Sequence, residues 1–320
     1  MFSLRRFAAV LLICFSLTAL AACGDEPSAG ASSSPPLPAA SSQEPPAQSV
    51  IEPQPVPELI PEPEPVPEPD PTPEPTPEPT PAPEPVPQPP AQKNTRLYVL
   101  MYHHVVPDGT NCNDWTITVS RLREDLQWLQ DNGYTCILPR ELAAGALLPE
   151  KAVMVTFDDG YASNYHLAFP LLQEFETKAV ISLITKRIED GHADFLTWEM
   201  CRELNDSGLV EIGSHTHDLH NGEVVNGIIR HPNESREAYE ARVFPDILHS
   251  VELIETNVGC DVTFFAYPHG RTEKWAEEFI ETTFASTAIT RHGPASIKRN
   301  LFDFPRFNIT VSDPVSEYLP

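Results

Sequence analysis

Hydrophobic and polar positions follow three different patterns along this chain. A short apolar segment near the N-terminus is followed by a long stretch without hydrophobic periodicity, and short β-branched apolar runs appear regularly only from Leu97 onward. These runs alternate with segments whose apolar residues recur every three or four positions. Continuous apolar runs are typical of strands buried on both faces, and the longer spacing is typical of amphipathic helices. The alternation predicts a parallel α/β barrel with its functional site at the carboxyl ends of the strands.

The expected strands are the runs richest in β-branched, aliphatic and aromatic residues. They cover 97–106, 135–138, 153–157, 178–185, 210–214, 263–267, 285–290 and 304–309. Between them, helices are predicted at about 120–133, 167–175, 197–208 and 275–280. A longer helical region, about 234–257, is expected to break near Pro245, because proline lacks the N–H that a helix interior requires.

The first residues have the pattern of a secretion signal. Arg5 and Arg6 precede the apolar run Phe7–Leu20, which is too short to span a membrane comfortably as a helix. The run ends in Leu-Ala-Ala-Cys, which resembles a bacterial lipoprotein signal in which Cys23 becomes the lipidated first residue. An ordinary signal peptide with an incidental cysteine is the alternative. We expect a lipid anchor that holds the mature protein on the extracytoplasmic face of the cell membrane.

Residues 24–94 have the composition of an extended, disordered linker. Pro-Glu-Pro repeats run from Glu52 to Pro90 and contain much of the 36 prolines and of the net charge of −25. Such a segment cannot bury a core, and about 40 residues in polyproline conformation would reach roughly 120 Å. A polyproline ligand for a partner domain is the alternative to a spacer. The sequence contains no basic run of the kind that would indicate binding to nucleic acid. The folded domain is therefore expected at 95–320.

Two adjacent carboxylates end one of the expected strands. In Val153–Gly160 an apolar run stops at Asp158, Asp159 and a glycine. Strand ends deliver side chains into sites, so one acid can bind a cation while the other, kept ionised by that charge, accepts a proton. Asp-Gly is also a common turn signal. The stretch alone therefore leaves a turn and a functional site open.

A second expected strand ends in a cluster of histidines. His215, His217 and His220 follow the strand at 210–214. Two imidazoles and one carboxylate leave coordination positions open for water and substrate, whereas a structural site would fill all four. Taken together, the two strand ends predict a catalytic metal site.

These two motifs carry a family resemblance. Thr-Phe-Asp-Asp-Gly at 156–160 and His-Thr-x-x-x-His at 215–220 resemble the polysaccharide deacetylases of the NodB-homology type, and the histidine spacing is similar to the branch that de-N-acetylates poly-β-1,6-N-acetylglucosamine. The resemblance covers roughly 97–309. It implies a distorted (β/α) barrel with fewer than eight regular units. It also implies Asp159, His215 and His220 as ligands of one divalent metal ion and Asp158 as the catalytic base. His217 lies between the two histidine ligands with the opposite strand parity, so we expect it either to point away or to support the ligands from outside.

The other family motifs are altered in this sequence. Ala266–Gly270 stands where the family has Arg-Pro-Pro-Tyr-Gly, so His269 takes the position that lends a backbone N–H to the oxyanion, and the arginine that tethers the base is missing. Arg306, charged within an apolar strand, could replace it or form a surface ion pair. The general acid of the family lies in a late Leu-x-x-His motif. Here that spacing occurs early, at His103, as in a circularly shifted barrel, although His103 and His104 could also be packed strand histidines.

The resemblance implies a hydrolase that removes N-acetyl groups from a surface polysaccharide containing N-acetylglucosamine. Zinc, nickel and cobalt all suit two histidines and a carboxylate, with zinc preferred. A tethered glycan-binding protein without turnover and an O-acetyl (xylan-type) esterase are the alternatives. Four cysteines remain after the signal, at 112, 136, 201 and 260, and they allow three disulfide pairings or buried free thiols.

Overall fold

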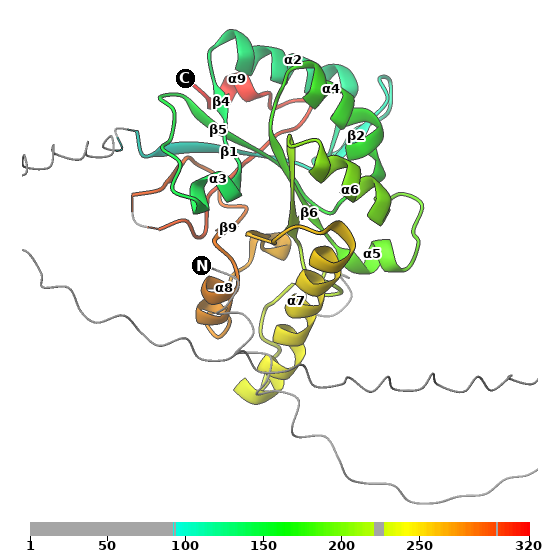
Figure 1. Ribbon diagram of the computed structural model, residues 1–320, viewed down its shortest axis with the longest axis vertical. Coiled ribbons are helices and arrows are strands. Elements are labelled where there is room, and N and C mark those ends of the chain that lie inside the picture. The colour runs from blue at the N-terminus through cyan, green and yellow to red at the C-terminus, as the bar shows by residue number, and fades with distance from the viewer. Residues whose placement is uncertain (1–91, 93, 221–226, 299) are drawn as a thin grey trace, which may run out of the picture. The chain divides into compact units, whose positions relative to one another are not determined.

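The computed structural model describes residue 92 and residues 94–220, 227–298 and 300–320, within a compact unit that spans Pro89–Pro320 (Figure 1). The predicted signal segment with Cys23 lies outside the described residues, and so does nearly all of the predicted linker. Apart from the gaps between these ranges, the described residues are those of the predicted folded domain, 95–320, together with residues 92 and 94.

A curled sheet of parallel strands forms the centre of this unit. The parallel strands follow one another in the order β1 (Arg96–Tyr102), β5 (Ala152–Phe157), β6 (Ala179–Leu183), β7 (Val210–Ser214), β8 (Phe264–Ala266) and β9 (Ser286–Ala288). Two short strands flank this path, since β4 (Thr135–Cys136) pairs with β5 and β10 (Ala295–Ser296) pairs antiparallel with β1. The first strand of the domain therefore lies beside the strand that ends in the two carboxylates.

A C-terminal segment joins the two ends of the curled sheet. Phe304 forms a parallel bridge with Ala288 of β9, and β11 (Phe307–Asn308) pairs in parallel with β1. Next to this pairing, the N–H of Ile309 donates to the carbonyl of Met101 at 3.0 Å. The sheet is a distorted barrel with fewer than eight regular strand–helix units, which confirms the predicted fold class.

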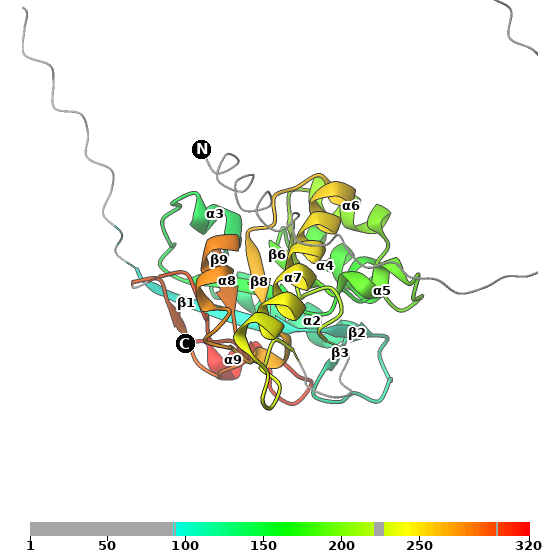
Figure 2. The same cartoon turned by 90° about the horizontal axis from the view of Figure 1, so that it is seen from below.

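Helices surround the sheet (Figure 2). The longer ones are α2 (Val119–Asp131), α4 (Phe169–Glu174), α6 (Trp198–Asp206), α7 (Arg236–Val258) and α8 (Glu277–Thr283). The shorter elements are α3 (Pro139–Ala143), α5 (Thr185–Glu189), α9 (Val315–Tyr318), the π-helical turn η1 (Asn164–Ala168), the 3-10 turn η2 (Pro268–Gly270) and the parallel pair β2 (His104–Val106) and β3 (Thr116–Thr118). In the part of the chain that is described, no helix has the length and apolarity needed to cross a membrane.

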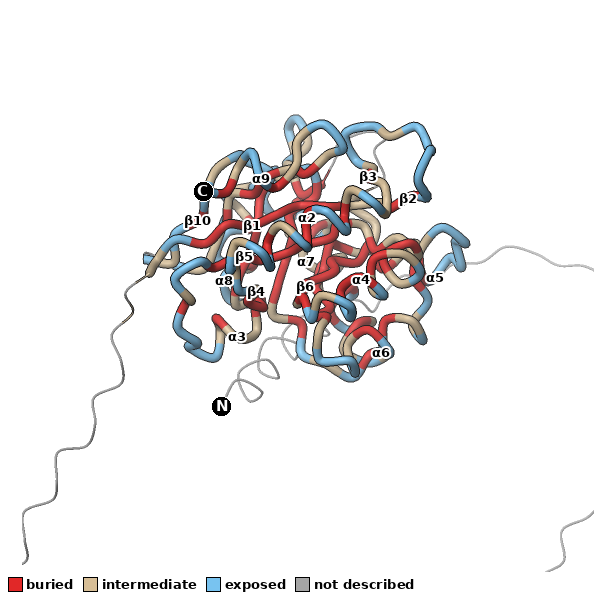
Figure 3. Tube along the Cα trace, turned by 90° about the horizontal axis from the view of Figure 1, so that it is seen from above, coloured by how far each residue is buried: buried red, intermediate tan, exposed pale blue. Residues whose placement is uncertain are grey.

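The central strands are buried on both faces, as their continuous apolar runs predicted. On β5, Val153, Val155 and Phe157 belong to the larger hydrophobic cluster, whereas Ala152 and Met154 belong to a second cluster. Figure 3 shows the strands in the buried centre and the exposed positions on the surrounding helices and loops. Complete burial of a side chain such as Val or Phe is worth about 1.5–3 kcal/mol. This packing holds the strand ends, and the polar groups that follow them, in fixed positions.

The predicted break at Pro245 is wrong, because α7 runs through it from Arg236 to Val258. Pro245 faces solvent, while Val243, Ile247 and residues on the turns before and after them are buried. Packing of one continuous apolar face therefore outweighs the loss of one helical hydrogen bond at proline. In the described part of the chain, Cys112, Cys136, Cys201 and Cys260 are all free thiols.

Candidate metal centre and catalytic site

The two carboxylates at the end of β5 have different neighbours. Asp158 continues the strand pairing, since its N–H donates to the carbonyl of Tyr102 at 2.9 Å, and its side chain is buried. At Asp159 the backbone enters the left-handed region with a φ of 72°, and Gly160 follows with a φ of 78°. A Cβ at position 160 would lie 2.7 Å from Leu183 Cδ2, so glycine is required there. The stretch thus forms a tight turn, and this turn places the two carboxylates at the end of β5.

Asp159, His215 and His220 converge on one point. Asp159 Oδ1 lies 3.6 Å from His215 Nε2 and 3.8 Å from His220 Nε2, and the three ligand atoms all lie within 4.8 Å of one another. Ligand atoms on one tetrahedral zinc ion, at bond lengths of about 2.0–2.2 Å, stand roughly 3.3–3.6 Å apart. The spacing is therefore close to what a single ion requires. Among the described residues this is the one such group of histidine, cysteine and acidic side chains.

The hydrogen bonds around this cluster also fit a bound cation. His215 Nδ1 lies 2.7 Å from the backbone carbonyl of Ala266, which fixes the proton on Nδ1 and leaves Nε2 as an acceptor. Asp159 Oδ1 is buried and has no hydrogen-bond partner. A buried carboxylate oxygen without a donor is costly unless a cation balances it. The three side chains therefore fit the metal that the sequence predicted.

Burial acts in opposite directions on the acid and the imidazole of this cluster, and a bound cation would reverse only its effect on the acid. Burial, together with the charge of Asp158, raises the pKa of Asp159 to about 7. Burial also lowers the pKa of His215 to about 3, so this imidazole is neutral at neutral pH. A neutral imidazole is the form that binds metal, and a bound cation favours the ionised form of Asp159.

Arg306 holds Asp158 through a buried, two-pronged ion pair. Its Nη1 lies 2.8 Å from Asp158 Oδ1 and its Nη2 lies 2.7 Å from Oδ2, and both side chains are almost inaccessible to solvent. Nη1 also donates to Thr156 Oγ1 at 3.2 Å, and Nε donates to the carbonyl of Ile289 at 3.0 Å. Burial alone would raise the pKa of Asp158, but the guanidinium more than offsets this and holds that pKa well below its usual value. Of the two possibilities left by the sequence, Arg306 thus forms a buried contact with Asp158, the predicted base, and not a surface ion pair.

His103 lies at the carboxyl end of β1, within the electrostatic range of Asp158, Arg306 and His220. Its ring packs edge-on against Trp115 at 4.9 Å between ring centroids, and its carbonyl accepts a bond from Asn164 Nδ2 at 2.8 Å. Burial lowers the pKa of His103 to about 4. The neighbouring His104 is bound instead to Ser163, with Nδ1 2.8 Å from Ser163 Oγ. The two histidines therefore have separate surroundings, and the charges of Asp158, Arg306 and His220 act on His103.

The remaining predicted residues surround the metal cluster. His269 has a φ of 57°, and its ring stacks on that of His220 at 4.2 Å between ring centroids. His217 lies in the loop between the two histidine ligands, but its Nδ1 is 3.0 Å from Thr185 Oγ1 and its ring packs against His249. His217 therefore makes its contacts outside the cluster, as expected.

Sequence reasoning missed one residue that contacts a predicted ligand. Tyr161 hydrogen-bonds to the side chain of Asp159, and its ring stacks on Phe195 at 4.9 Å between ring centroids. Burial, with a further contribution from Asp159, raises the pKa of Tyr161 to about 12, so its hydroxyl remains a donor. Its position two residues after Asp159, directly behind the turn glycine, was the available signal.

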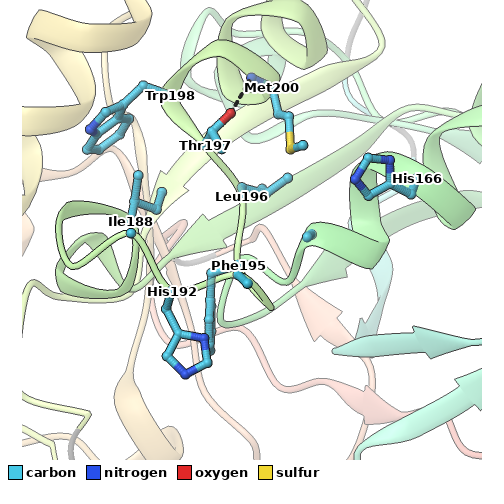
Figure 4. A pocket seen from close by; sticks show the side chains of 11 residues that line it. His166, Ile188, His192, Phe195, Leu196, Thr197, Trp198 and Met200 are labelled. Carbon is cyan, nitrogen blue, oxygen red and sulfur yellow. Dashed lines mark hydrogen bonds between the residues drawn. The ribbon is translucent and has the colours of Figure 1, made fainter.

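A cavity of about 220 Å³ lies close to the turn after β5, and Figure 4 shows the side chains around it. Its lining includes His166, Ile188, His192, Phe195 and Trp198, but none of the three predicted metal ligands. Two bonds fix the cavity wall to the turn, because Ala162 N donates to Asp194 O and Leu196 N donates to Gly160 O, both at 2.9 Å. Cavities that bind drug-sized ligands usually measure about 300–1,000 Å³. This one is smaller, and it adjoins the candidate site without being part of it.

Comparisons with known proteins agree with this geometry. The profile of the polysaccharide deacetylase family matches residues 146–283. YxkH of Bacillus subtilis (strain 168) is 29% identical over 225 residues, which are 69% of this chain and 74% of the relative. The poly-β-1,6-N-acetyl-D-glucosamine N-deacetylase of Escherichia coli (strain K12) is 28% identical over 251 residues, which are 68% of this chain but only 37% of that enzyme.

A solved structure shows the same relationship. The de-N-acetylase from Aggregatibacter actinomycetemcomitans superimposes with a TM-score of 0.61 and 26% sequence identity, covering 69% of this chain and 97% of that structure. Both motifs that carry the resemblance, 156–160 and 215–220, lie within the matched profile. The family predicted from these motifs is thereby confirmed, since residues 146–283 match the profile of the polysaccharide deacetylases.

Proposed function

We propose that the folded domain is a metal-dependent de-N-acetylase that hydrolyses acetamide groups on a polymer containing N-acetylglucosamine. The observation that carries the proposal is that a candidate metal cluster and a separate, ionised carboxylate lie side by side at the end of β5. Asp159 converges with His215 and His220, while the adjacent Asp158 is held ionised by Arg306. Together they offer a cation site with open positions and a base beside it.

Asp159, His215 and His220 would hold one divalent cation. A cation held there supplies Lewis acidity, since it polarises the acetyl carbonyl and lowers the pKa of water to about 7. Zinc, nickel and cobalt all suit this set of two nitrogens and one oxygen, and we propose zinc as the preferred ion.

Asp158 is the proposed base, which takes a proton from the attacking water. Its lowered pKa makes Asp158 a weak base, but the carboxylate is fully ionised at neutral pH. It needs to accept a proton only from a water molecule whose own pKa a cation would lower. The arginine keeps both carboxylate oxygens oriented, because a two-pronged bond fixes the plane of the carboxylate. Arg306 thus sets both the charge and the orientation of the base.

His103 is the proposed proton donor to the leaving amine. With its pKa lowered by burial to about 4, it is neutral at rest and would take up its proton during turnover. The negative charge of Asp158 raises the pKa of His103 and so opposes the effect of burial. Negative charge that develops on the substrate would raise this pKa further. His269 is the proposed source of the backbone N–H that stabilises that charge.

The substrate and the location of the enzyme are further parts of the proposal. The named activity of the E. coli relative supports a β-1,6-linked N-acetylglucosamine polymer. The lipoprotein-type signal supports a membrane anchor at Cys23, with the Pro/Glu-rich linker extending the domain from the extracytoplasmic face toward that polymer.

Acetate release from defined oligomers tests the proposal. The chain from Gly24 onward would be incubated with β-1,6- and β-1,4-linked N-acetylglucosamine oligomers, and with an O-acetylated xylan, before and after removal of metal by a chelator. We expect acetate from the β-1,6 oligomer, loss of activity with chelator and recovery on addition of zinc. Activity that persists without metal would contradict the metal assignment, and release from the xylan alone would make the enzyme an esterase. Metal binding without any acetate release would indicate a glycan-binding protein.

A further inference from the structure

The loop that joins the two proposed histidine ligands is hydrogen-bonded to residues of β7, α7 and α5. After His215 the backbone enters the left-handed region at Thr216, with a φ of 73°, which is unfavourable for a β-branched residue. The N–H of Thr216 donates to the side chain of Ser214, the last residue of β7, with 3.2 Å between N and Oγ. A backbone in this conformation persists only where its surroundings hold it.

One carboxylate on α7 holds the next two residues of this loop. The N–H of His217 donates to Asp246 Oδ1 and the N–H of Asp218 donates to Asp246 Oδ2, both at 2.9 Å. Each oxygen of the carboxylate thus accepts one of two consecutive backbone N–H groups. Hydrogen bonds to an ionised acceptor are roughly twice as strong as neutral ones.

The helix that carries Asp246 is itself fixed to the strand before the loop. Ser250, one helical turn further along α7 and fully buried, lies with its Oγ 2.9 Å from Ser214 Oγ at the end of β7. Residues four apart lie on the same face of a helix, so Asp246 and Ser250 face the strand end together. Val243 and Ile247, both buried, pack α7 into the core around them. The carboxylate is therefore presented from a rigid element.

The other side of the loop is held by backbone groups. The N–H groups of Thr185 and Lys186, at the start of α5, donate to the carbonyls of Thr216 and His217, both at 3.2 Å. These bonds restrain the carbonyl side of the loop, whereas Asp246 restrains its N–H side. A variant at position 246 would remove one of these two restraints and leave the other intact.

We propose that Asp246 is a positioning residue of the metal centre, which keeps His215 and His220 at the spacing that lets both reach one ion with Asp159. The inference rests on the proposed function, because it assumes that these three side chains bind metal. Within the described part of the chain, the carboxylate of Asp246 accepts hydrogen bonds from the N–H groups of His217 and Asp218 and not from the three cluster side chains, so it acts through the loop backbone.

Loss of this carboxylate should weaken metal binding without removing a ligand. Asp246→Ala leaves two backbone N–H groups without their acceptor, and the loop gains freedom that metal binding must then remove. Loss of a partner that orients a metal ligand typically costs about 10- to 100-fold in metal affinity. Asp246→Asn keeps one acceptor oxygen but faces the second N–H with an amide, so its affinity should lie between that of Asp246→Ala and that of the parent.

The test compares cobalt affinity in the chain from Gly24 onward. Dissociation constants would be measured by competition with a chromophoric chelator for the parent, Asp246→Ala, Asp246→Asn and Glu252→Ala, well below the melting temperature of each metal-free protein. Glu252→Ala is the matched control, since it removes an acidic side chain that is 78% exposed from the same helix. Acetate release at saturating metal would be recorded in parallel.

We expect the dissociation constant to rise about 10- to 100-fold in Asp246→Ala, less in Asp246→Asn and not at all in Glu252→Ala. At saturating cobalt the Asp246 variants should recover most of the parent activity, because every ligand and the base remain. Unchanged affinity in folded Asp246→Ala would overturn the positioning role, even if its melting temperature falls. If Asp246→Ala does not fold, unchanged affinity in Asp246→Asn has the same meaning. A parent chain that binds no cobalt would instead refute the proposed function.

Discussion

Arg306→Met is the change that separates a functional tether from an incidental ion pair. The substitution keeps an unbranched side chain of similar length and removes both N–H groups that bind Asp158, at 2.8 and 2.7 Å. Neither partner has access to water, since Arg306 is 0% exposed and Asp158 is 2% exposed. Water therefore cannot replace the lost bonds, and Asp158 is left as a buried carboxylate without its cation.

The expected loss of stability is large. Removal of one partner from a buried ion pair costs about 3–5 kcal/mol, because an uncompensated charge remains. A domain of this size typically has a free energy of unfolding of about 5–15 kcal/mol, so the variant should fold with a visibly lower melting temperature. The pKa of Asp158 should rise, since burial raises it and the guanidinium no longer opposes this. At neutral pH kcat/KM should fall by at least about 10², the lower range for loss of a positioned base.

Two measurements would check this reasoning. The acidic limb of the pH–rate profile should move to higher pH in Arg306→Met, and less so in Arg306→Lys, which keeps the charge but not the two-pronged geometry. Unfolding in urea should show that Arg306→Met costs less in an Asp158→Asn background than in the parent. Equal costs in both backgrounds would refute the ion pair as the cause. Arg123→Met removes an arginine whose side chain is 47% exposed, and as the control it should change stability by no more than about 0.5 kcal/mol.

Three further predictions follow from the site and the core. Asp158→Asn should abolish acetate release but still bind cobalt, whereas Asp159→Asn should also lose affinity for cobalt; equal loss in both, measured by titration, would mean that the two roles are reversed. His103→Ala should lower kcat about 10²–10⁴-fold on the acetamide but less on an activated ester, and should leave the dissociation constant for cobalt unchanged. Burial raises the pKa of Asp125 to about 6, above its unfolded value, so its contribution to stability is complete below about pH 4 and is lost as the pH rises through 6. Denaturant unfolding of Asp125→Asn between pH 4 and 7 should lack that decline, about 3 kcal/mol, and an identical decline in both proteins would contradict the assignment.

The strands and the cluster of Asp159, His215 and His220 could be predicted because their signals are local. The run that ends in Asp158 and Asp159 is apolar because β5 is buried on both faces, and its polar residues begin where the strand leaves the core. The histidine loop follows the same logic after β7. Parallel strands bring their carboxyl ends to one edge of the sheet. The two motifs therefore meet, although 55 residues lie between Asp159 and His215 in the sequence.

Contacts that depend on tertiary packing could not be predicted from spacing. Asp158 and Arg306 are 148 residues apart, and the only signal was a charged residue within an apolar strand. Pro245 was expected to end a helix, yet the buried face of α7 continues past it. The contact between Asp246 and the histidine loop could not be predicted either. A single aspartate within a polar helical stretch is typical of a solvated side chain, and only the folded structure places the loop beside it.

The position of Arg306 links Asp158, the proposed base, to the closure of the barrel. Phe304 bridges to Ala288 of β9, and β11 pairs with β1 from Phe307, so Arg306 lies between the residues that join the two ends of the sheet. Its own N–H donates to the carbonyl of Arg291 at 2.9 Å, and its guanidinium reaches across to Asp158 on β5. Separation of this segment from either end would remove the cation from Asp158 and let burial raise the pKa of the base. The arginine of the family motif would stand at position 266, the last residue of β8, whereas in this chain the charge state of Asp158, the proposed base, depends on the last segment that completes the fold.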